Sequence, residues 1–126
     1  MAVLLLATAA HASHDTWTIV KVKQIAEGTD KACTYHRVER CAGLRAPLPR
    51  LARTAGEPCP HDPTRFCLGN GSPYSGGYDP IHDMVILAPD DDWDGDEALR
   101  HEFIHYLRCK NGRDCYNHDG PEWTCQ

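Results

Sequence analysis

The chain has 126 residues, of which 41% are hydrophobic and 25% charged, a composition typical of one folded globular domain. Its formal net charge of −5 argues against a general binder of nucleic acid or of anionic membranes. Seven cysteines are many for so short a chain. A chain this short can bury only a small hydrophobic core, and small secreted domains often compensate with disulfides. The cysteines therefore predict a small domain stabilised by disulfides.

The first twelve residues, MAVLLLATAAHA, are predicted to be a signal peptide. An apolar stretch, Ala2–Ala10, leads into the small-x-small pattern Ala10-His11-Ala12 of a signal-peptidase site. No basic residue precedes the apolar stretch, as expected if the leader begins further upstream. We therefore expect a mature domain over 13–126, secreted to the extracellular space or the periplasm. No apolar run is long enough to span a bilayer, so no membrane association is expected.

The first half of the chain predicts few regular elements. Trp17–Ile25 roughly alternates apolar and polar residues and predicts a half-buried strand. Asp30–Gly43 is ambiguous, although Asp30 could cap a short helix with Ala32, Tyr35 and Val38 on one side. Frequent prolines and glycines predict that 46–80 is mostly loop.

The second half contains the clearest strand and the clearest helix. Asp83–Ala88 is predicted to be a strand, because it is apolar from Met84 onward and is ended by a proline. Asp94–Leu107 is predicted to be a helix, because Asp94 is a plausible N-cap and Glu97 completes a capping-box-like start. Asn111-Gly112 provides the stop signal.

This helix contains the sequence His101-Glu102-Phe103-Ile104-His105, an H-E-x-x-H motif. At about 100° per residue, the two histidines project from one face, one turn apart, as two ligands of a single metal ion require. Glu102 lies at the edge of that face, where its carboxylate can reach a water molecule on the metal. Leu99, Phe103 and Leu107 lie on the opposite arc and are expected to be buried against a sheet.

A catalytic zinc site needs three protein ligands and an open position. The candidates downstream of the helix are Asp114, His118, Asp119 and Glu122. The chain must turn back after the helix to reach the metal, and Gly112 permits that reversal. His118 is the preferred third ligand because imidazole is a common zinc ligand, with Glu122 and Asp119 as alternatives.

The segment HEFIHYLRCKNGRDCYNHDGPEW resembles the active-site segment of SprT-like minimal zincin peptidases, in which H-E-x-x-H is followed by His-Gly-Pro-Glu. The resemblance covers His101–Trp123, with Asp119 standing between His118 and the Gly-Pro-Glu. It implies His101, His105 and His118 as zinc ligands and Glu102 as the catalytic carboxylate. The leader and the many cysteines do not resemble an intracellular SprT-like protein, so only the metal site is carried over.

The implied reaction is hydrolysis of a peptide bond in a peptide or protein substrate. Zinc lowers the pKa of a bound water toward neutrality, and Glu102 would take its proton and pass it to the leaving amine. By analogy with other zincins, the strand around Met84–Ala88 could be an edge that pairs with extended substrate. The developing oxyanion also needs a donor. The candidate donors are Tyr78, His82, Tyr106 and Tyr116.

Two other kinds of metal site fit the sequence less well. Asp90, Asp92, Asp94 and Gly95 fit the opening of a calcium loop, but position 12 is His101 instead of glutamate, so Ca²⁺ is the weaker alternative. The cysteine spacings do not fit the paired knuckles of a structural zinc finger. The cysteines are therefore predicted to form disulfides. Cys59 and Cys67 can pair locally, and Cys109 is predicted to bond Cys125, with Cys115 as the alternative partner.

Together these patterns predict a small α+β zincin-like domain, with a short sheet, one active-site helix and stabilising disulfides. The predicted function is that of a secreted, monomeric zinc metallopeptidase that binds neither nucleic acid nor membranes. The alternatives are a non-catalytic secreted binding module stabilised by zinc or calcium, and a zinc amidase acting on a cell-wall linkage.

Overall fold

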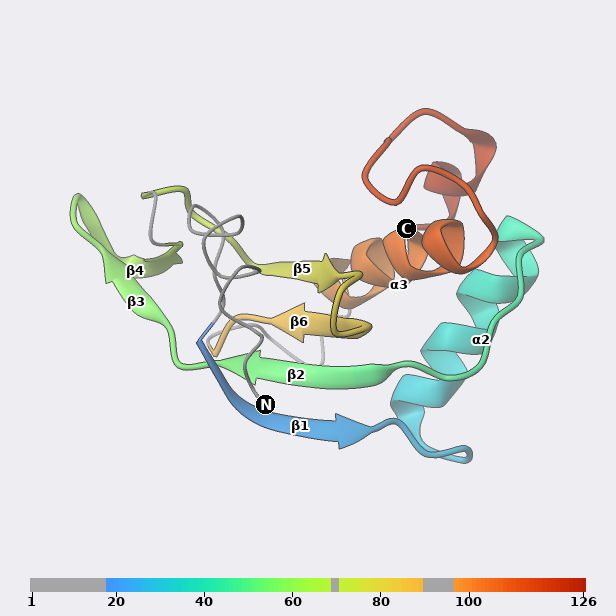
Figure 1. The fold of residues 1–126 in the computed structure, drawn as a ribbon, viewed down its shortest axis with the longest axis horizontal. Coiled ribbons are helices and arrows are strands. Elements are labelled where there is room, and N and C mark those ends of the chain that lie inside the picture. Colours follow the sequence, from blue (N-terminus) through green and yellow to red (C-terminus); the bar gives the residue numbers. More distant parts are fainter. Residues whose placement is uncertain (1–17, 69–70, 90–96) are drawn as a thin grey trace.

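The computed structural model describes residues 18–68, 71–89 and 97–126, which form a small α+β fold with two sheets and two α-helices (Figure 1). The α+β class and the stabilising disulfides predicted from the sequence are thus confirmed. The predicted signal peptide and the acidic segment proposed as a calcium loop lie outside the described residues. The elements are β1 (Ile19–Gln24), α2 (Asp30–Ala42), β2 (Arg50–Thr54), β3 (Glu57–Cys59), β4 (Asp62–Cys67), β5 (Gly76–Asp79), β6 (Met84–Leu87), α3 (Glu97–Lys110) and the 3-10 helix η1 (Pro121–Cys125).

The main sheet has the strand order β1-β2-β6-β5, with β2 and β6 parallel and the other two pairs antiparallel. The predicted strand Asp83–Ala88 corresponds to β6, which lies inside the sheet and is buried along its whole length. The prediction that this strand is an edge is therefore wrong, because β5 pairs with its outer side. β5 is the edge strand next to α3 (Figure 1).

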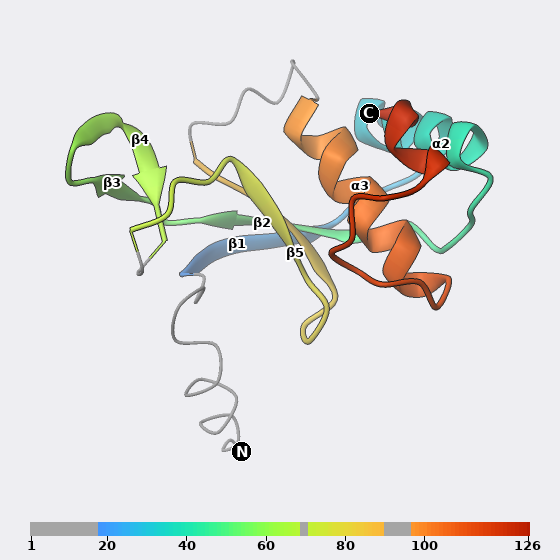
Figure 2. The same ribbon diagram turned by 90° about the horizontal axis from the view of Figure 1, so that it is seen from above.

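Both helices lie on one face of the main sheet, and the principal core fills the space between (Figure 2). Leu99, Phe103 and Leu107 of α3 are buried there, as predicted. Ala32, Tyr35 and Val38 of α2 are buried too, and the Tyr35 and Phe103 rings meet edge to face at 5.1 Å between centroids. Buried apolar area of this kind is the main stabilising contribution in a small domain. The core thereby fixes α3 and, with it, the H-E-x-x-H motif.

The ends of α2 follow ordinary capping rules, although not at the predicted residue. Thr29, and not Asp30, is the N-cap, and its hydroxyl accepts a hydrogen bond from the Ala32 amide. Asp30 instead occupies the first turn, where a carboxylate interacts favourably with the helix dipole. The helix ends at Gly43, whose left-handed φ of 69° suits glycine.

The prediction of loop over 46–80 is wrong, because the segment contains the four strands β2 to β5. These strands have only three to six residues, and the prolines and glycines that separate them dominated the composition. β3 and β4 form a separate two-stranded sheet at the end of the molecule opposite the helices (Figure 1). The strand predicted at Trp17–Ile25 is present as β1, but the prediction that it is half-buried is wrong: five of its six residues are exposed, Val20 to 64%.

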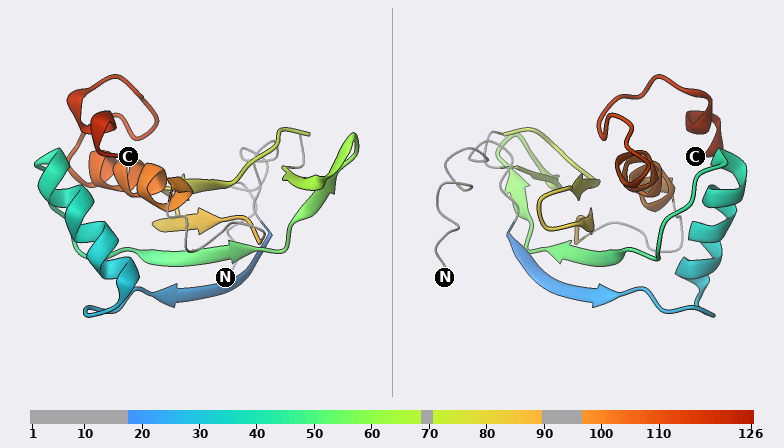
Figure 3. Two further views of the ribbon diagram at one scale, coloured as in Figure 1. Left: turned by 180° about the vertical axis from the view of Figure 1, so that it is seen from behind. Right: turned by 45° about the vertical axis from the view of Figure 1, so that its right-hand side comes forward.

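Three disulfides are present, Cys41–Cys125, Cys59–Cys67 and Cys109–Cys115, and Cys33 is free. The local pair Cys59–Cys67 was predicted. The predicted Cys109–Cys125 bond is wrong: the loop after α3 returns at once and brings Cys115 within 4.4 Å of Cys109 between Cα atoms. Cys125 lies in η1, which packs against both helices (Figure 3). Its disulfide to Cys41 links η1 to the end of α2. None of the helices in the described part of the chain has the length and apolarity needed to cross a membrane.

Candidate metal centre

The histidines of the H-E-x-x-H motif project from the side of α3 that faces the loop after the helix, where His101 is half-buried and His105 buried. They are one turn apart, and their Nε2 atoms lie 3.2 Å from each other. The opposite side of the helix is anchored in the core by Leu99, Phe103 and Leu107. The position of both imidazoles is therefore determined by the packing of α3.

His118 joins this pair from the loop between α3 and η1. Its Nε2 lies 3.3 Å from Nε2 of His101, and ligand atoms of all three histidines lie within 4.8 Å of one another. In a tetrahedral zinc site with Zn–N bonds of about 2.0–2.1 Å, nitrogen ligands are about 3.3–3.4 Å apart. The His101–His105 and His101–His118 spacings thus fit neighbouring ligands of one tetrahedral metal ion, and all three imidazoles converge within 4.8 Å.

The remaining ring nitrogens determine which atoms are free to bind a metal. Nδ1 of His105 donates to the carbonyl of Cys115 at 2.6 Å, and Nδ1 of His101 donates to Oε1 of Gln126 at 2.7 Å. In a neutral ring the lone pair is then on Nε2, so two nitrogens that both carry lone pairs lie 3.2 Å apart and repel each other. A bound cation converts this repulsion into attraction, and hydrogen bonds of this kind are typical of the outer shell of metal-binding histidines.

His105 is also in the protonation state that a metal ligand needs. Its pKa is lowered to about 4, chiefly by burial and also by the neighbouring His101 and His118 rings, whereas the hydrogen bond to Cys115 acts in the opposite direction. His105 is therefore neutral at pH 7. Metal ligands must be deprotonated, so little free energy is spent on removing a proton.

Trp123 packs against the cluster from η1. Its ring centroid lies 4.9 Å from His101, 4.8 Å from His105 and 4.6 Å from His118. The indole Nε1 donates to the carbonyl of Asn117 at 3.1 Å, one residue before His118. Trp123 thus shields the three imidazoles on one side and binds the loop that supplies the third.

Glu102 is buried at the side of α3 that faces β5. A Cβ added to Gly76 of β5 would lie 3.2 Å from Cγ of Glu102 and 2.7 Å from the carbonyl oxygen of Ile86. The glycine therefore permits the close approach of the edge strand to the glutamate. Glu102 is next to His101 in the helix, so a carboxylate, the histidines and an edge strand occur together.

The alternative third ligands have other roles. Glu122 is buried, and Arg108 and Arg113 bind its two carboxylate oxygens. The side chain of Asp114 accepts a hydrogen bond from the backbone amide of Tyr116 at 2.9 Å. Asp119 is exposed and lies outside the histidine cluster. His118 is the candidate that the fold brings to the motif.

Of the four candidate oxyanion donors, Tyr116 is the one whose ring lies near the cluster, 6.3 Å from the ring of His105. The Tyr78 hydroxyl donates to Asp83 at 2.7 Å, and His82 bonds Asp79 at 2.7 Å. The Tyr106 hydroxyl donates to Pro47, at 2.6 Å.

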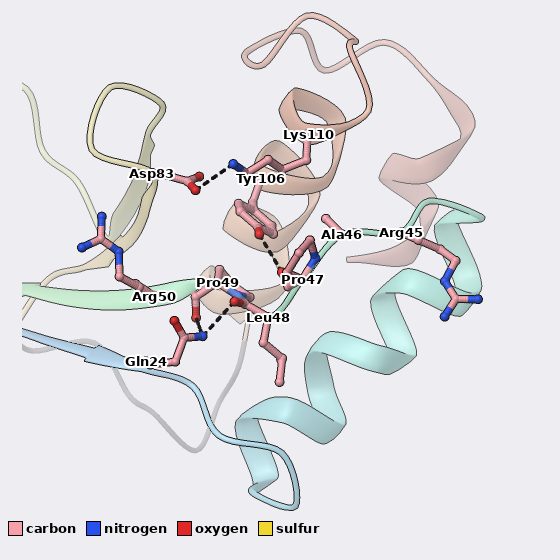
Figure 4. Close-up of a pocket in the computed structure, with 10 residues that line it drawn as sticks. All are labelled: Gln24, Arg45, Ala46, Pro47, Leu48, Pro49, Arg50, Asp83, Tyr106 and Lys110. Atoms are coloured by element: carbon pink, nitrogen blue, oxygen red, sulfur yellow. Dashed lines mark hydrogen bonds and ion pairs between the residues drawn. The ribbon is translucent and has the colours of Figure 1, made fainter.

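Tyr106 lines a cavity of about 320 Å³ beside the C-terminal part of α3 (Figure 4). The cavity is bounded by the loop between α2 and β2 and, near Asp83, by the turn between β5 and β6. Lys110 reaches across to Asp83, at 2.7 Å. The cavity contains no histidine and one carboxylate, so it is not a second metal centre.

Comparisons of the chain with protein-family models, with curated proteins and with solved structures found no match. The class of site therefore rests on its geometry: three convergent imidazoles beside a buried glutamate, on a helix that packs against a sheet. Gln126, Trp123 and the carbonyl of Cys115 were not predicted from the sequence, and no local pattern marks them.

Proposed function

We propose that this chain is a secreted zinc metallopeptidase with a zincin-like fold. His101, His105 and His118 would hold the metal, and Glu102 would act as general base. The observation that supports the proposal best is the convergence of the three histidines beside the glutamate of the motif, with His101 at zinc-like spacing from both of the others. The three disulfides are compatible with an oxidising compartment outside the cell.

Zinc, when bound at these histidines, would activate water and polarise the scissile carbonyl. The work of the chain is then proton transfer and positioning. The Glu102 carboxylate accepts the proton that water loses as its oxygen attacks the carbonyl carbon. It then passes this proton to the nitrogen of the leaving amine as the C–N bond breaks.

The edge strand provides a place for the substrate backbone. β5 pairs with β6 on one side, and an extended peptide could pair with its other side by strand addition. Gly76 and Gly77 leave that part of the strand without side chains, next to Glu102. Tyr116 is 57% exposed and near His105, so its hydroxyl is our candidate donor to the oxyanion.

The test combines metal analysis with proteolysis of a casein-type substrate. Wild type should bind one zinc ion per chain and cleave the substrate. Glu102→Gln should retain the zinc and lose about 10²–10⁴-fold in activity, the usual contribution of a general base. His118→Ala should lose zinc affinity. Undiminished cleavage by Glu102→Gln contradicts the proposal, and zinc binding without cleavage of peptides or cell-wall amides favours a binding module.

A further inference from the structure

A buried carboxylate that the proposed reaction does not use lies close to the metal centre. Glu122 is 2% exposed, and its partner Arg108 is 6% exposed. The Arg108 guanidinium binds one carboxylate oxygen of Glu122, and Arg113 binds the other at 2.9 Å. A buried ion pair seldom adds much stability over apolar residues of similar size, but removing one partner is costly. The buried ion pair instead favours one arrangement of the segments that carry Arg108 and Glu122.

Arg108 binds the loop that carries His118 on both sides of that histidine. Its Nε donates to the carbonyl of Asp114 at 2.9 Å, and one terminal nitrogen donates to the carbonyl of Asp119 at 3.4 Å. Asp114 precedes His118 by four residues, and Asp119 follows it directly. One side chain of the core-anchored helix α3 thus binds the loop at two carbonyls and η1 at Glu122.

The backbone is shaped to fit this ion pair. Gly120 has a φ of 153°, and a Cβ there would collide with the Glu122 carboxylate and lie 3.1 Å from the guanidinium of Arg108. The disulfides fix the same segment only at its ends, Cys115 and Cys125. Between these ends, the ion pair connects the loop to the helix that carries the other two histidines.

We infer that the Arg108–Glu122 ion pair is a positioning device that holds His118 at the metal. The inference rests on the metal site of the proposed function, but not on catalysis. When the ion pair is broken, His101 and His105 remain on α3, whereas the loop can move His118 away. Loss of such an outer-shell contact typically lowers metal affinity about 10–100-fold.

The test uses the oxidised full chain and zinc, with affinity measured by competition with a chromophoric chelator. Glu122→Gln keeps the side-chain size and removes the charge. Arg113→Gln is a milder variant, because this arginine is half exposed and Arg108 still holds the carboxylate. Lys110→Gln is the matched control, since it breaks an ion pair of the same helix on the side of Asp83. Thermal unfolding confirms that each variant is folded.

We expect Glu122→Gln to bind zinc about 10–100-fold more weakly than wild type and Arg113→Gln several-fold more weakly, with Lys110→Gln unchanged. The decisive measurement repeats each change in a His118→Ala background. If the ion pair acts through His118, the further loss there should be less than about threefold, because the ligand it positions is already absent. Substituted with Co²⁺, Glu122→Gln should give the visible spectrum of His118→Ala.

Equal losses in both backgrounds, or affinity as in wild type, would overturn the inference. If Glu122→Gln does not fold, the same pair of measurements on Arg113→Gln decides the question. Zinc binding with the expected coupling but without hydrolysis would overturn the proposed enzyme and leave the positioning role intact. A wild-type chain that binds no zinc overturns both.

Discussion

At the scale of single residues, Gly76 shows how closely the edge strand approaches the proposed general base. An added methyl group would lie 2.7 Å from the carbonyl oxygen of Ile86 and 3.2 Å from Cγ of Glu102. A backbone carbonyl inside a sheet cannot move aside at low cost. We therefore expect Gly76→Ala to lower the free energy of unfolding by about 1–3 kcal/mol, as overpacking does.

The same substitution should also lower peptidase activity, because it pushes β5 away from Glu102. Urea unfolding and the casein-type assay measure the two effects. Ser75→Ala is the control, since Ser75 is exposed and contributes its backbone carbonyl to Ala88. Full stability in Gly76→Ala would show that the strand can shift freely and would remove the steric argument.

Gln126 provides a second test at this scale. Its side-chain oxygen accepts the Nδ1 proton of His101 at 2.7 Å and thereby keeps Nε2 available for the metal. Gln126→Ala should weaken zinc binding by about tenfold, the lower end of the usual outer-shell effect, because water can replace an exposed acceptor. Chelator competition measures the loss. Thr124→Ala, whose hydroxyl donates to Pro121 in the same turn, should leave zinc affinity unchanged.

At the scale of elements, the sequence predicts the helices and strands whose pattern lies within a single segment of the chain. The spacing of Leu99, Phe103 and Leu107 predicts the buried face of α3 because helical periodicity is a property of one segment. β6 was found because it is apolar throughout and ends before a proline. β2 to β5 were missed because strands of three to six residues broken up by prolines and glycines have little periodicity of their own. β2 in addition pairs only with β1 and β6, which lie far along the chain.

The same distinction applies to the metal centre. His101, Glu102 and His105 are neighbours on one helix, so their spacing alone places them together. His118 was predicted from its residue type and from the resemblance to minimal zincins. The contacts that hold the centre in place, from Gln126 and Arg108, depend on where the loop after α3 returns. That return also decided the cysteine pairing that the sequence left open.

α2 contains a pH-sensitive contact. His36 donates Nδ1 to Glu39 at 2.6 Å and Nε2 to Glu27 at 2.8 Å. The hydrogen bond to Glu39, and then that to Glu27, raise the pKa of His36 above its usual value near 6.5. Since both ring nitrogens donate, the protonated form is favoured in the folded chain.

A raised pKa in the folded state means that the contribution of His36 to stability is fully present below about pH 6.5. It is lost as the pH rises through the higher pKa of the folded chain. We therefore expect the stability difference between wild type and His36→Gln to shrink as the pH is raised from 6 to 9. Urea unfolding at a series of pH values measures it, and a constant difference would contradict the contact.

At the scale of the whole molecule, the disulfides differ in what they stabilise: one constrains the segment that forms the metal centre, and another stabilises only the fold. Cys41–Cys125 links residues 84 apart and closes the end of α2 onto η1, whereas Cys59–Cys67 links residues 8 apart in the small sheet away from the helices. In the loop-closure model these bonds contribute about 4–5 and about 2–3 kcal/mol, respectively. Only the first constrains the segment that carries His118.

The double substitutions Cys41→Ser/Cys125→Ser and Cys59→Ser/Cys67→Ser should therefore separate the two roles. The first should lose about 4–5 kcal/mol in unfolding free energy and several-fold in zinc affinity, because η1 with Trp123 and Gln126 is released from α2. The second should lose about 2–3 kcal/mol and keep wild-type zinc affinity. Equal zinc affinity in the two variants would mean that the Arg108–Glu122 ion pair and the Cys109–Cys115 loop hold the third histidine without help from α2.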